Sequence, residues 1–272
     1  MPRAVGVIPA RYSSTRFPGK PLASLHGKPL VQHVWERSVR ARRLERVVVA
    51  TDDERIRKAV ASFGGEAIMT AAGHATGTDR VQEAVERIEA GGMPIDIVLN
   101  IQGDEALVDP EALDRMVAVL AENPALPYAT LAEPFSDAAE MMDPSTCKVV
   151  TDAAGNALYF SRSPIPFVRA ASAAGILPLG KALEERSKPL AGYLRHVGIY
   201  GFRRAALDEF SKLPEGELER LEGLEQLRVL EAGLRMRVIV SSRITMDVDL
   251  PNDLAKVESI LADEQLAQKE RG

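Results

Sequence analysis

Short apolar runs and stretches of helical periodicity alternate along the first hundred residues. Four apolar runs have the length and β-branched content of buried strands: Ala4 to Ile8, Val47 to Ala50, Ala67 to Met69 and Ile95 to Ile101. Between the first two runs, apolar side chains recur at helical spacing at Leu30, Val31, Val34, Trp35 and Val39. Strands that alternate with helices of this length predict a mostly parallel sheet with right-handed crossovers.

The expected helices have recognisable ends. Asp52 or Asp53 can cap a helix that ends near residues 64–65. Thr78 can cap the next helix, which ends at residues 91–92 and whose apolar face carries Val81, Val85 and Ile88. Ligands of such sheets bind beyond the carboxyl ends of the strands, so the loops at 11–20 and 102–105 are expected to face a ligand.

The pattern changes near residue 127. Further strands are predicted at Tyr128 to Ala132, Lys148 to Val150, Ala157 to Phe160, His196 to Phe202 and Val238 to Val240. A turn at 152–156 would return the third of these antiparallel to the second. Apolar residues at helical spacing predict one helix through Leu218, Leu221, Leu224, Leu227 and either Val229 or Leu230. Pro251 suits the first residue of a terminal helix.

A single α/β domain covers residues 1–272 in this interpretation, because no linker divides the core pattern. A smaller antiparallel lobe is expected as an insertion at about residues 125–200. Residues 163–192 are rich in Pro, Ala, Gly and Ser, and they are predicted to form a long exposed excursion.

Composition excludes several classes of protein. The chain has 272 residues, 46% of them hydrophobic and 27% charged, which is typical of a globular protein with a sizeable core. Its net charge of −5 argues against bulk nucleic-acid binding, so any anion site must be local. The single cysteine, Cys147, excludes an internal disulfide framework, and a small half-buried residue is its expected role rather than a catalytic thiol.

Membrane insertion and export are not expected. No stretch approaches the roughly 18 continuous apolar residues that span a bilayer. The N-terminus lacks the charged region, long apolar region and cleavage site of an export signal. A cytoplasmic location is therefore the expectation.

The loop after the first apolar run gathers positive charge and hydroxyl groups. Arg11, Arg16 and Lys20 lie within ten positions, with Ser13, Ser14 and Thr15 between them. Such a concentration of donors is suited to a polyanion, and a triphosphate fits best. The motif is neither Gly-x-x-x-x-Gly-Lys-Ser/Thr nor Gly-x-Gly-x-x-Gly, so side-chain cations would do more of the binding than a glycine-rich loop. The alternative is a solvated basic loop, which the position after a buried strand disfavours.

Asp104 is the second candidate, because "QGDE" at 102–105 directly follows the apolar run Ile95 to Ile101. A carboxylate at that edge is well placed to hold Mg²⁺ beside phosphates, although it could also be a turn or cap residue. We expect Gly103 to let the backbone turn tightly there. Asp247 and Asp249 are two apart and would share a face in an extended stretch, and Asp249 could equally cap the final helix.

Other candidates are weak when judged from their residue types alone. "ATGTDR" at 75–80 resembles a helix cap with a charged first turn. His196 is more often a packed residue than a catalyst in such a context, and Arg162 alone indicates little. Glu222 and Glu225 are three apart, as on the solvated surface of a helix.

Long motifs resemble the 3-deoxy-manno-octulosonate cytidylyltransferase (CMP-KDO synthetase) family from about residue 4 to 258. They are "IPARYSSTRFPGKPL", "NIQGDE", "ALYFSRSPIP", "LRHVGIYGF" and "LEGLEQLRVLE". The resemblance implies a three-layer, Rossmann-like α/β fold of the nucleotide-diphospho-sugar transferase type, with a mostly parallel sheet. It implies that CTP and the eight-carbon acid sugar 3-deoxy-manno-octulosonate (KDO) give CMP-KDO and pyrophosphate for lipopolysaccharide biosynthesis, with Mg²⁺ as cofactor, in a homodimer formed through the smaller lobe.

The resemblance also implies roles for individual residues. Catalysis would fall to Arg11, Arg16, Lys20 and Asp104. Nucleotide contacts would come from Ala10, Arg11, Ser14, Thr15, Arg16, Lys20, Gly77, Thr78, Asp79, Arg80 and Gln102. The sugar would meet Arg162, His196, Tyr200, Glu225 and Gln226, with Arg162 able to pair with its carboxylate. The metal ligands would be Asp104 and Asp249.

The chain departs from the family's usual pattern at three positions. Ala106 and Leu250 replace a common proline and threonine, and Asp247 replaces a common glycine, which adds a carboxylate beside the expected metal site. Two alternatives stay open: a cytidylyltransferase for a related acid sugar, such as the 8-amino analogue of KDO or sialic acid, and a non-catalytic nucleotide-binding protein on the same scaffold. An amine at the sugar's far end would require an acidic or acceptor-lined pocket.

Overall fold

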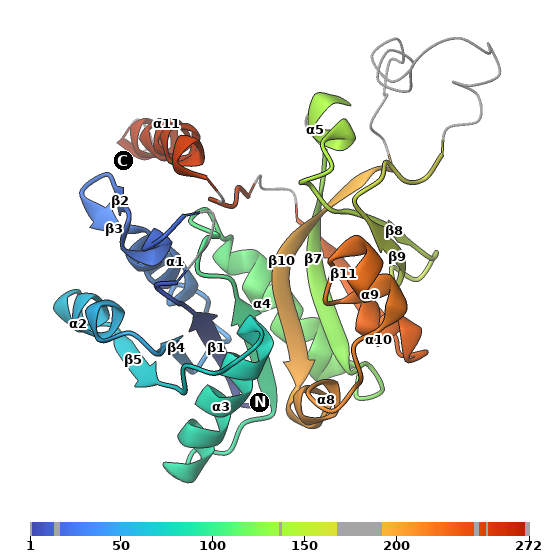
Figure 1. Ribbon diagram of the computed structural model, residues 1–272, viewed down its shortest axis with the longest axis horizontal. Coiled ribbons are helices and arrows are strands. Elements are labelled where there is room, and N and C mark those ends of the chain that lie inside the picture. Colours follow the sequence, from blue (N-terminus) through green and yellow to red (C-terminus); the bar gives the residue numbers. More distant parts are fainter. Residues whose placement is uncertain are drawn as a thin grey trace.

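The computed structural model describes residues 2–13, 17–135, 138–167, 192–241, 245–248 and 250–269, with the backbone alone from 264 onward. Ser14, Thr15, Arg16 and Asp249 lie outside these residues, as does most of the excursion expected at 163–192. Figure 1 shows two halves that share one sheet, with the N-terminal half on the left and the C-terminal half on the right.

Within the described residues, nine strands form the main sheet, and seven of them lie side by side in the order β11-β7-β10-β6-β1-β4-β5. The predicted strands of the first half are present as β1 (Ala4–Pro9), β4 (Arg46–Thr51), β5 (Glu66–Met69) and β6 (Ile97–Ile101). All pair in parallel, with β1 between β4 and β6. Helices cover both faces of such strands, which explains why their sequences are almost continuously apolar.

Helices cover the sheet on both faces and make the three layers expected from the sequence (Figure 1). One apolar cluster joins the sheet to α1 (Leu30–Ser38), α2 (Glu54–Ser62) and α4 (Pro110–Glu122). A second cluster joins the opposite face to α3 (Gly77–Ala90), α8 (Arg204–Phe210) and α10 (Leu227–Glu231). The α/β class and the mostly parallel sheet are thus confirmed.

The second half joins the same sheet through a reversed strand. β10 (Leu194–Arg203) runs antiparallel to both β6 and β7 (Tyr128–Pro134), and β11 (Met236–Val240) pairs with β7 in parallel. β8 (Lys148–Thr151) and β9 (Ala157–Ser161) form the predicted antiparallel pair, which branches from the beginning of β10 at Leu194 and Arg195. Of the lobe expected at about residues 125–200, the two long strands therefore belong to the main sheet, and β8, β9 and α5 (Ala138–Met142) extend from it.

Three local predictions were wrong. Thr76, not Thr78, caps α3, because its side chain and that of Asp79 bond each other's backbone N–H groups. The single helix expected through Leu218 to Leu230 is two helices, α9 (Glu217–Glu222) and α10, because Gly223 adopts a left-handed φ of 64° and ends the first. Val39 lies just past the end of α1 and is exposed rather than buried.

The C-terminal helix α11 (Pro251–Lys269) begins at Pro251 as predicted. It packs against the small hairpin of β2 (Ser24–Leu25) and β3 (Lys28–Pro29), next to the short 3₁₀ helix η1 (Lys20–Leu22). β11 lies at the opposite side of the molecule, so the chain between β11 and α11 crosses from one half to the other (Figure 1).

Candidate active site

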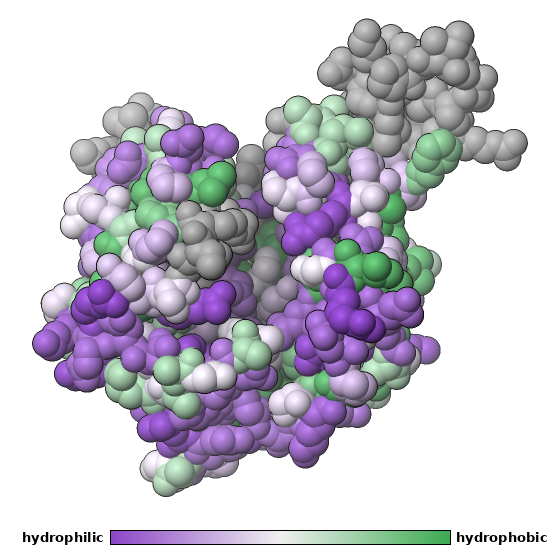
Figure 2. Space-filling view, in the orientation of Figure 1, coloured by the Kyte–Doolittle hydropathy of each residue, from purple (hydrophilic) through white to green (hydrophobic). Residues whose placement is uncertain are grey.

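A pocket of about 930 Å³ lies between the two halves, beyond the carboxyl end of β6. Figure 2 shows this hollow, which polar side chains border. Gln102, Asp104, Arg162 and His196, all site residues predicted from the sequence, line it. Segments up to 94 residues apart in the chain, from 102 to 196, thus meet in one cavity, as the position of ligand sites in open α/β sheets predicts.

Lys20 and Asp104 meet at this edge of the sheet. Lys20 follows β1 and begins η1, Asp104 follows β6, and the Lys20 Nζ donates to Asp104 Oδ2 at 2.5 Å. Both side chains are largely buried, with 16% and 23% of their surface exposed. The predicted phosphate-binding lysine and the predicted metal-binding carboxylate therefore form one charged pair.

Gly103 is required for space rather than for an unusual turn. The φ angle of Gly103 is not positive, so any residue could adopt this backbone conformation. An added Cβ, however, would lie 3.0 Å from the Pro9 carbonyl oxygen. Gly77 makes a similar approach, because its Cβ would lie 3.5 Å from Pro9 Cγ. The ends of β1 and β6 and the start of α3 therefore converge, which is the arrangement that the nucleotide-binding prediction for these segments requires.

Four predicted residues cannot be placed, since Ser14, Thr15, Arg16 and Asp249 lie outside the described residues. Ala10 is buried, and its N–H donates to the Ala50 carbonyl at 2.9 Å. Arg11 follows it and is exposed.

A chain of hydrogen bonds links the predicted nucleotide and sugar residues. Gln102 Nε2 donates to Asn100 Oδ1 at 3.2 Å, and Asn100 Nδ2 donates to the Thr78 hydroxyl at 3.3 Å. That hydroxyl donates to Glu225 Oε2 at 2.8 Å. The other carboxylate oxygen of Glu225 is buried without a hydrogen-bond partner, and burial raises the pKa of this carboxyl. Thr78 and Glu225 are thus parts of one network, although they are 147 positions apart.

Asp79 and Arg80 make contacts within the protein. Asp79 completes the cap of α3 with Thr76. Arg80 is almost fully buried, where its guanidinium donates to the Thr70 hydroxyl at 2.5 Å and lies 3.4 Å from Asp52. The described contacts of these two residues hold the start of α3 against the ends of β4 and β5.

His196 is buried at the back of the pocket. Its Nε2 lies 2.8 Å from the Thr130 hydroxyl, which also donates to the Ile199 carbonyl at 2.9 Å. With the hydroxyl proton used in that way, Nε2 carries a proton and donates to Thr130. Burial, reinforced by the charge of Arg195, lowers the pKa of His196 to about 3, so the imidazole is neutral. The ring lies between Phe160 and Tyr200, with centroids 5.0 and 5.5 Å away.

Tyr200 and Gln226 form a second polar contact beside His196. The Tyr200 hydroxyl donates to Gln226 Oε1 at 3.1 Å, and Gln226 Nε2 points to the Cys147 sulfur at 3.7 Å. Burial raises the pKa of the Cys147 thiol to about 12, which keeps it protonated and unreactive, as expected for a packing role. The predicted sugar residues His196, Tyr200 and Gln226 are therefore neighbours in the fold.

Arg162 holds loops together at the pocket wall. Its guanidinium donates to four backbone carbonyls, those of Pro144, Ser145, Glu222 and Gly223. The Glu222 carboxylate in turn accepts from the Ser161 hydroxyl at 2.7 Å and from the Arg162 N–H at 2.9 Å. The Glu222 carboxylate thus connects α9 to β9 and the residue after it. Its spacing from Glu225 had instead favoured a position on a solvated helix surface.

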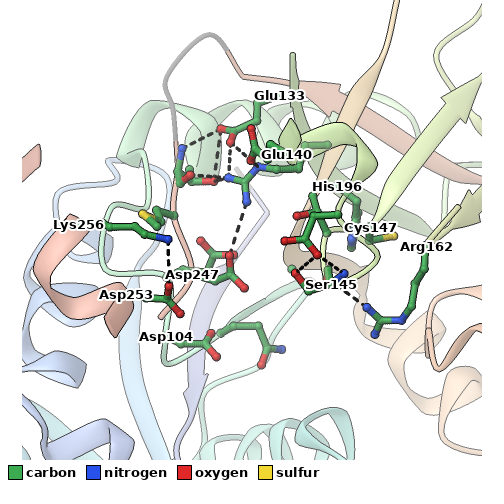
Figure 3. Close-up of a pocket in the computed structure, with 18 of the residues that line it drawn as sticks. Asp104, Glu133, Glu140, Ser145, Cys147, Arg162, His196, Asp247, Asp253 and Lys256 are labelled. Atoms are coloured by element: carbon green, nitrogen blue, oxygen red, sulfur yellow. Dashed lines mark hydrogen bonds and ion pairs between the residues drawn. The ribbon is translucent and has the colours of Figure 1, made fainter. Parts of the chain in front are cut away.

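Arg195 and Glu133 are site residues that the sequence analysis did not identify. Both are buried, with the guanidinium of Arg195 on β10 paired with Glu133 on β7. Arg195 also lies 3.3 Å from Glu140 and 3.5 Å from Asp247 (Figure 3). A glutamate within the otherwise apolar run at 128–134 was the available signal, because a buried charge requires a partner.

Glu105 adds a further buried carboxyl next to Asp104. Only 4% of it is exposed, and its Oε2 has no hydrogen-bond partner. Burial and the charges of Asp247 and Asp104 raise its pKa well above the usual range. Gly198, in the irregular part of β10, leaves the room that Gln102 and Glu105 occupy, because its Cβ would lie 3.4 and 3.8 Å from them.

Carboxyl groups outnumber cationic groups around the pocket. Seven carboxyl groups line it, against three cations from Arg162, Arg195 and Lys256 (Figure 3); the acids are Asp104, Glu105, Glu133, Glu140, Asp143, Asp247 and Asp253. Within the part of the chain that the structure describes, no three His, Cys, Asp or Glu side chains converge to hold a metal by themselves. A site of this kind can share a divalent cation with an anionic ligand, since Mg²⁺ is commonly held by one or two carboxylates and substrate phosphates.

The family model for cytidylyltransferases matches residues 5–239. The chain belongs to the cytidylyltransferase family. A 3-deoxy-manno-octulosonate cytidylyltransferase of Syntrophotalea carbinolica is 48% identical over 94% of this chain and 97% of its own length. One of Escherichia coli is 45% identical over 97% of this chain and 98% of its own.

Solved structures agree with this assignment. CMP:2-keto-3-deoxy-manno-octonic acid synthetase, solved with CTP, has a TM-score of 0.83 and 44% identity over 96% of this cytidylyltransferase and 99% of its own chain. 4-Diphosphocytidyl-2C-methyl-D-erythritol synthase, at 17% identity and a TM-score of 0.60, covers 95% of this chain and 99% of its own, and it shares the fold. The resemblance predicted from the sequence motifs, and the nucleotidyltransferase class with it, are confirmed.

Proposed function

We propose that this cytidylyltransferase joins CTP and KDO to give CMP-KDO and pyrophosphate, as a step of lipopolysaccharide biosynthesis. The observation that carries the proposal is the Lys20–Asp104 pair, whose carboxylate lines the pocket, in a chain 48% identical to a KDO cytidylyltransferase. In the reaction, the anomeric hydroxyl oxygen of KDO bonds to the α-phosphorus. The bond from that phosphorus to the bridging oxygen of the β-phosphate breaks, and the hydroxyl proton leaves.

The residues of the first loop would bind the triphosphate. Phosphoryl transfer requires mainly positioning and neutralisation of charge, because the protein does little covalent chemistry. Lys20, which pairs with Asp104, would contact the departing pyrophosphate, and Asp104 would hold the cation. Arg11 and Arg16 are proposed to contact the same phosphates.

Mg²⁺ fits the carboxyl-rich wall of the pocket. Asp104 would hold it together with phosphate oxygens, and Asp249 is proposed as the second protein ligand. The excess of carboxyl groups and the unpartnered oxygen of Glu105 support a divalent cation here. When bound, Mg²⁺ would offset phosphate charge and lower the pKa of the attacking hydroxyl.

The sugar would lie between the phosphates and β10. His196 lines the pocket, Tyr200 and Gln226 lie beside it, and Glu225 belongs to the hydrogen-bond network that includes Gln102. A neutral His196 can bond a sugar hydroxyl through Nδ1, because its Nε2 is used by Thr130. Arg162 stays proposed as the partner of the sugar carboxylate, in addition to its contacts with four carbonyls.

Pyrophosphate release with CTP, KDO and Mg²⁺ tests the proposal directly. We expect Asp104→Asn to lower kcat by about 100-fold, because the loss of a metal ligand should cost at least as much as the loss of a group that orients one. Asp253→Asn is the matched control: this carboxylate lines the same pocket but caps α11, and an amide oxygen can still accept from the Leu250 N–H. Full Mg²⁺-dependent activity of Asp104→Asn would exclude the assigned role.

The acidic lining favours one second candidate, the 8-amino analogue of KDO. Seven carboxyl groups around the pocket would suit an ammonium group on the far end of the sugar. Parallel measurements of kcat/KM with KDO, its 8-amino analogue and sialic acid separate these substrates. A higher value for the amino sugar would replace KDO in the proposal.

We also propose a homodimer and a cytoplasmic location, where CTP is available. Leu158 on β9 and Phe167 at the end of the described segment are 60% and 70% exposed. Leu158 lines an apolar depression together with Val150, Ile165 and Leu194, and Phe167 directly follows Pro166, another lining residue. A second copy could cover this surface. Among the described helices, none is long and apolar enough to cross a bilayer.

A further inference from the structure

Part of the segment between β11 and α11 lines the pocket, through Thr245, Met246 and Asp247. Its described residues Thr245–Val248, here called the strap, have buried ends, since Thr245 and Val248 are 2% and 0% exposed. The strap contains Asp247, whose carboxylate lies 3.5 Å from Arg195 and whose side chain lies between Glu140 and Asp104 in Figure 3.

The first end of the strap is fastened by the buried ion pair. Glu133 Oε2 accepts from the Thr245 N–H at 2.7 Å, and Arg195 donates to the Thr245 carbonyl and, at 3.0 Å, to its hydroxyl. The backbone donor and acceptor of Thr245 are therefore both held by charged groups, and hydrogen bonds to charged groups are stronger than neutral ones.

The second end of the strap is fastened to the site itself. The Val248 N–H donates to the backbone carbonyl of Asp104 at 3.1 Å. The Val248 side chain packs with Ala106 and Leu107, which follow Asp104, and with α11. Asp104 is thus held from two sides, by Lys20 at its carboxylate and by the strap at its backbone.

The burial of the Arg195–Glu133 pair indicates that it orients the strap rather than adds net stability. The side chains of Arg195 and Glu133 are only 9% and 5% exposed, and such a pair adds little net stability compared with apolar residues of similar size. Its directional bonds to Thr245 are what apolar residues could not supply. Glu140 and Asp247 lie farther from Arg195, at 3.3 and 3.5 Å, and are secondary contacts.

We propose that Arg195 and Glu133 are positioning residues for Asp104: they fix the strap, and the strap fixes the loop that presents this carboxylate to the metal–nucleotide complex. This inference rests on the proposed function, because it assumes that Asp104 binds the metal. Neither residue needs to touch a substrate for the effect.

The test measures metal binding without turnover. Mn²⁺ is titrated into the protein with CTP and without KDO, and its affinity is followed by electron paramagnetic resonance. We expect Glu133→Gln to weaken Mn²⁺ binding about 10-fold, within the range for groups that orient metal ligands. Hydrogen exchange at the Val248 amide should become faster in the same variant, because the strap is released at Thr245.

Two further variants separate positioning from general stability. Glu89→Gln is the matched control, because it breaks the Arg204–Glu89 pair, with N–O distances of 2.9 and 3.0 Å, on α3 and α8 away from the pocket. It should leave Mn²⁺ affinity unchanged. If Glu133→Gln does not fold, the double variant Glu133→Leu and Arg195→Met removes both buried charges, and it should still show the weaker Mn²⁺ binding.

Asp104→Asn distinguishes the two proposals. If this variant binds Mn²⁺ as tightly as the unaltered protein, the metal assignment of the proposed function fails. If Asp104→Asn loses Mn²⁺ binding while folded Glu133→Gln or the double variant keeps it, the positioning role of Arg195 and Glu133 is overturned. Weaker binding in all of these, with Glu89→Gln unchanged, supports the inference.

Discussion

Burial decides how the polar residues of this site behave. His196 shows it most clearly, because the imidazole contacts Thr130 and two aromatic rings and has a pKa of about 3. Burial raises the pKa values of Glu105 and Glu225, whereas it lowers that of His196. The cause is the same, because desolvation disfavours the charged form of each group. The pocket thus combines neutral groups suited to sugar hydroxyls with the charged pair of Lys20 and Asp104.

The low pKa of His196 predicts a pH dependence of stability. The unfolded chain binds a proton at this position below about pH 6.5, whereas the folded chain does so only near pH 3. The unfolded state therefore binds more protons between these values, and stability falls as pH decreases from 6.5 toward 3. Between pH 7 and 5, His196 should account for about 2 kcal/mol of the loss in unfolding free energy.

Urea unfolding at pH 7 and pH 5 checks this value. His196→Asn keeps a donor for Thr130 and lacks the titrating ring, so its stability should fall less between the two pH values. Equal losses for the variant and the unaltered chain would show that the imidazole is not held neutral.

Some of these residues could be identified from the sequence and others could not. Lys20 and Asp104 each follow an apolar run, and parallel topology places such positions at one edge of the sheet, so their meeting follows from a pattern. Arg195 and Glu133 are 62 positions apart on strands that pair antiparallel, and nothing local specifies that register. Glu225 appeared solvated because its helix was expected to be continuous, whereas the break at Gly223 turns it toward Thr78.

At the scale of elements, β10 joins the two halves of the sheet. It lies between β6 and β7 and carries both Arg195 and His196 at one end. Its other end packs directly against α4, because Gly201 leaves room for Met116 and Leu120. The close approach of α4 leaves no space for a side chain at this position of β10, which explains a glycine within a long, buried strand.

Gly201→Ala should destabilise the protein by about 1–3 kcal/mol. The new Cβ would lie 2.8 Å from Met116 Sδ and 2.9 Å from Leu120 Cδ1, and both side chains are fully buried, so neither has room to move away. Gly73→Ala is the matched control, because its Cβ would meet nothing within 4 Å. Urea unfolding of the two variants measures the difference, and equal stabilities would contradict tight packing of α4 on β10.

The predicted strands were mostly correct because each is an apolar run bounded by polar residues, whereas helix ends depended on single contacts. Thr76 and Thr78 are both competent caps by type, and only the reciprocal bond with Asp79 decides for Thr76. α4 and α8 received no prediction, although α4 begins with Asp109 as cap and Pro110 as first residue, a recognisable start. For α8, the Arg203 cap position has no side-chain bond, so no such signal exists.

At the scale of the whole molecule, the chain closes on itself across its site. α11 packs on the β2–β3 hairpin next to the residues that follow β1, although Pro251 comes 222 positions after Pro29, and the strap that precedes it lines the pocket. The alternation of strands and helices predicted the sheet, but it contains no information about this return. Contacts of such sequence separation depend on Val248, Val257 and Leu261, which are buried together with Leu25 and Leu30.

The exposed apolar surface of β8 and β9 leads to a last prediction, on assembly. If a second copy covers Leu158, which is 60% exposed, then Leu158→Asp should convert a dimer into monomers, because a buried, unpaired charge is costly. Val39→Asp is the control, since this 44% exposed residue lies at the end of α1 in the other half. Sedimentation velocity at several protein concentrations gives the mass of each variant. A Leu158→Asp protein that stays dimeric, or an unaltered chain that is monomeric throughout, would remove β9 from the interface.

The expected interface and the pocket are connected through β8. Cys147, which directly precedes β8, lines the pocket, whereas Val150 and Thr151 of β8 line the apolar depression. Loss of the dimer is therefore expected to lower kcat/KM as well as mass, and restoring activity at high protein concentration would tie the two effects together.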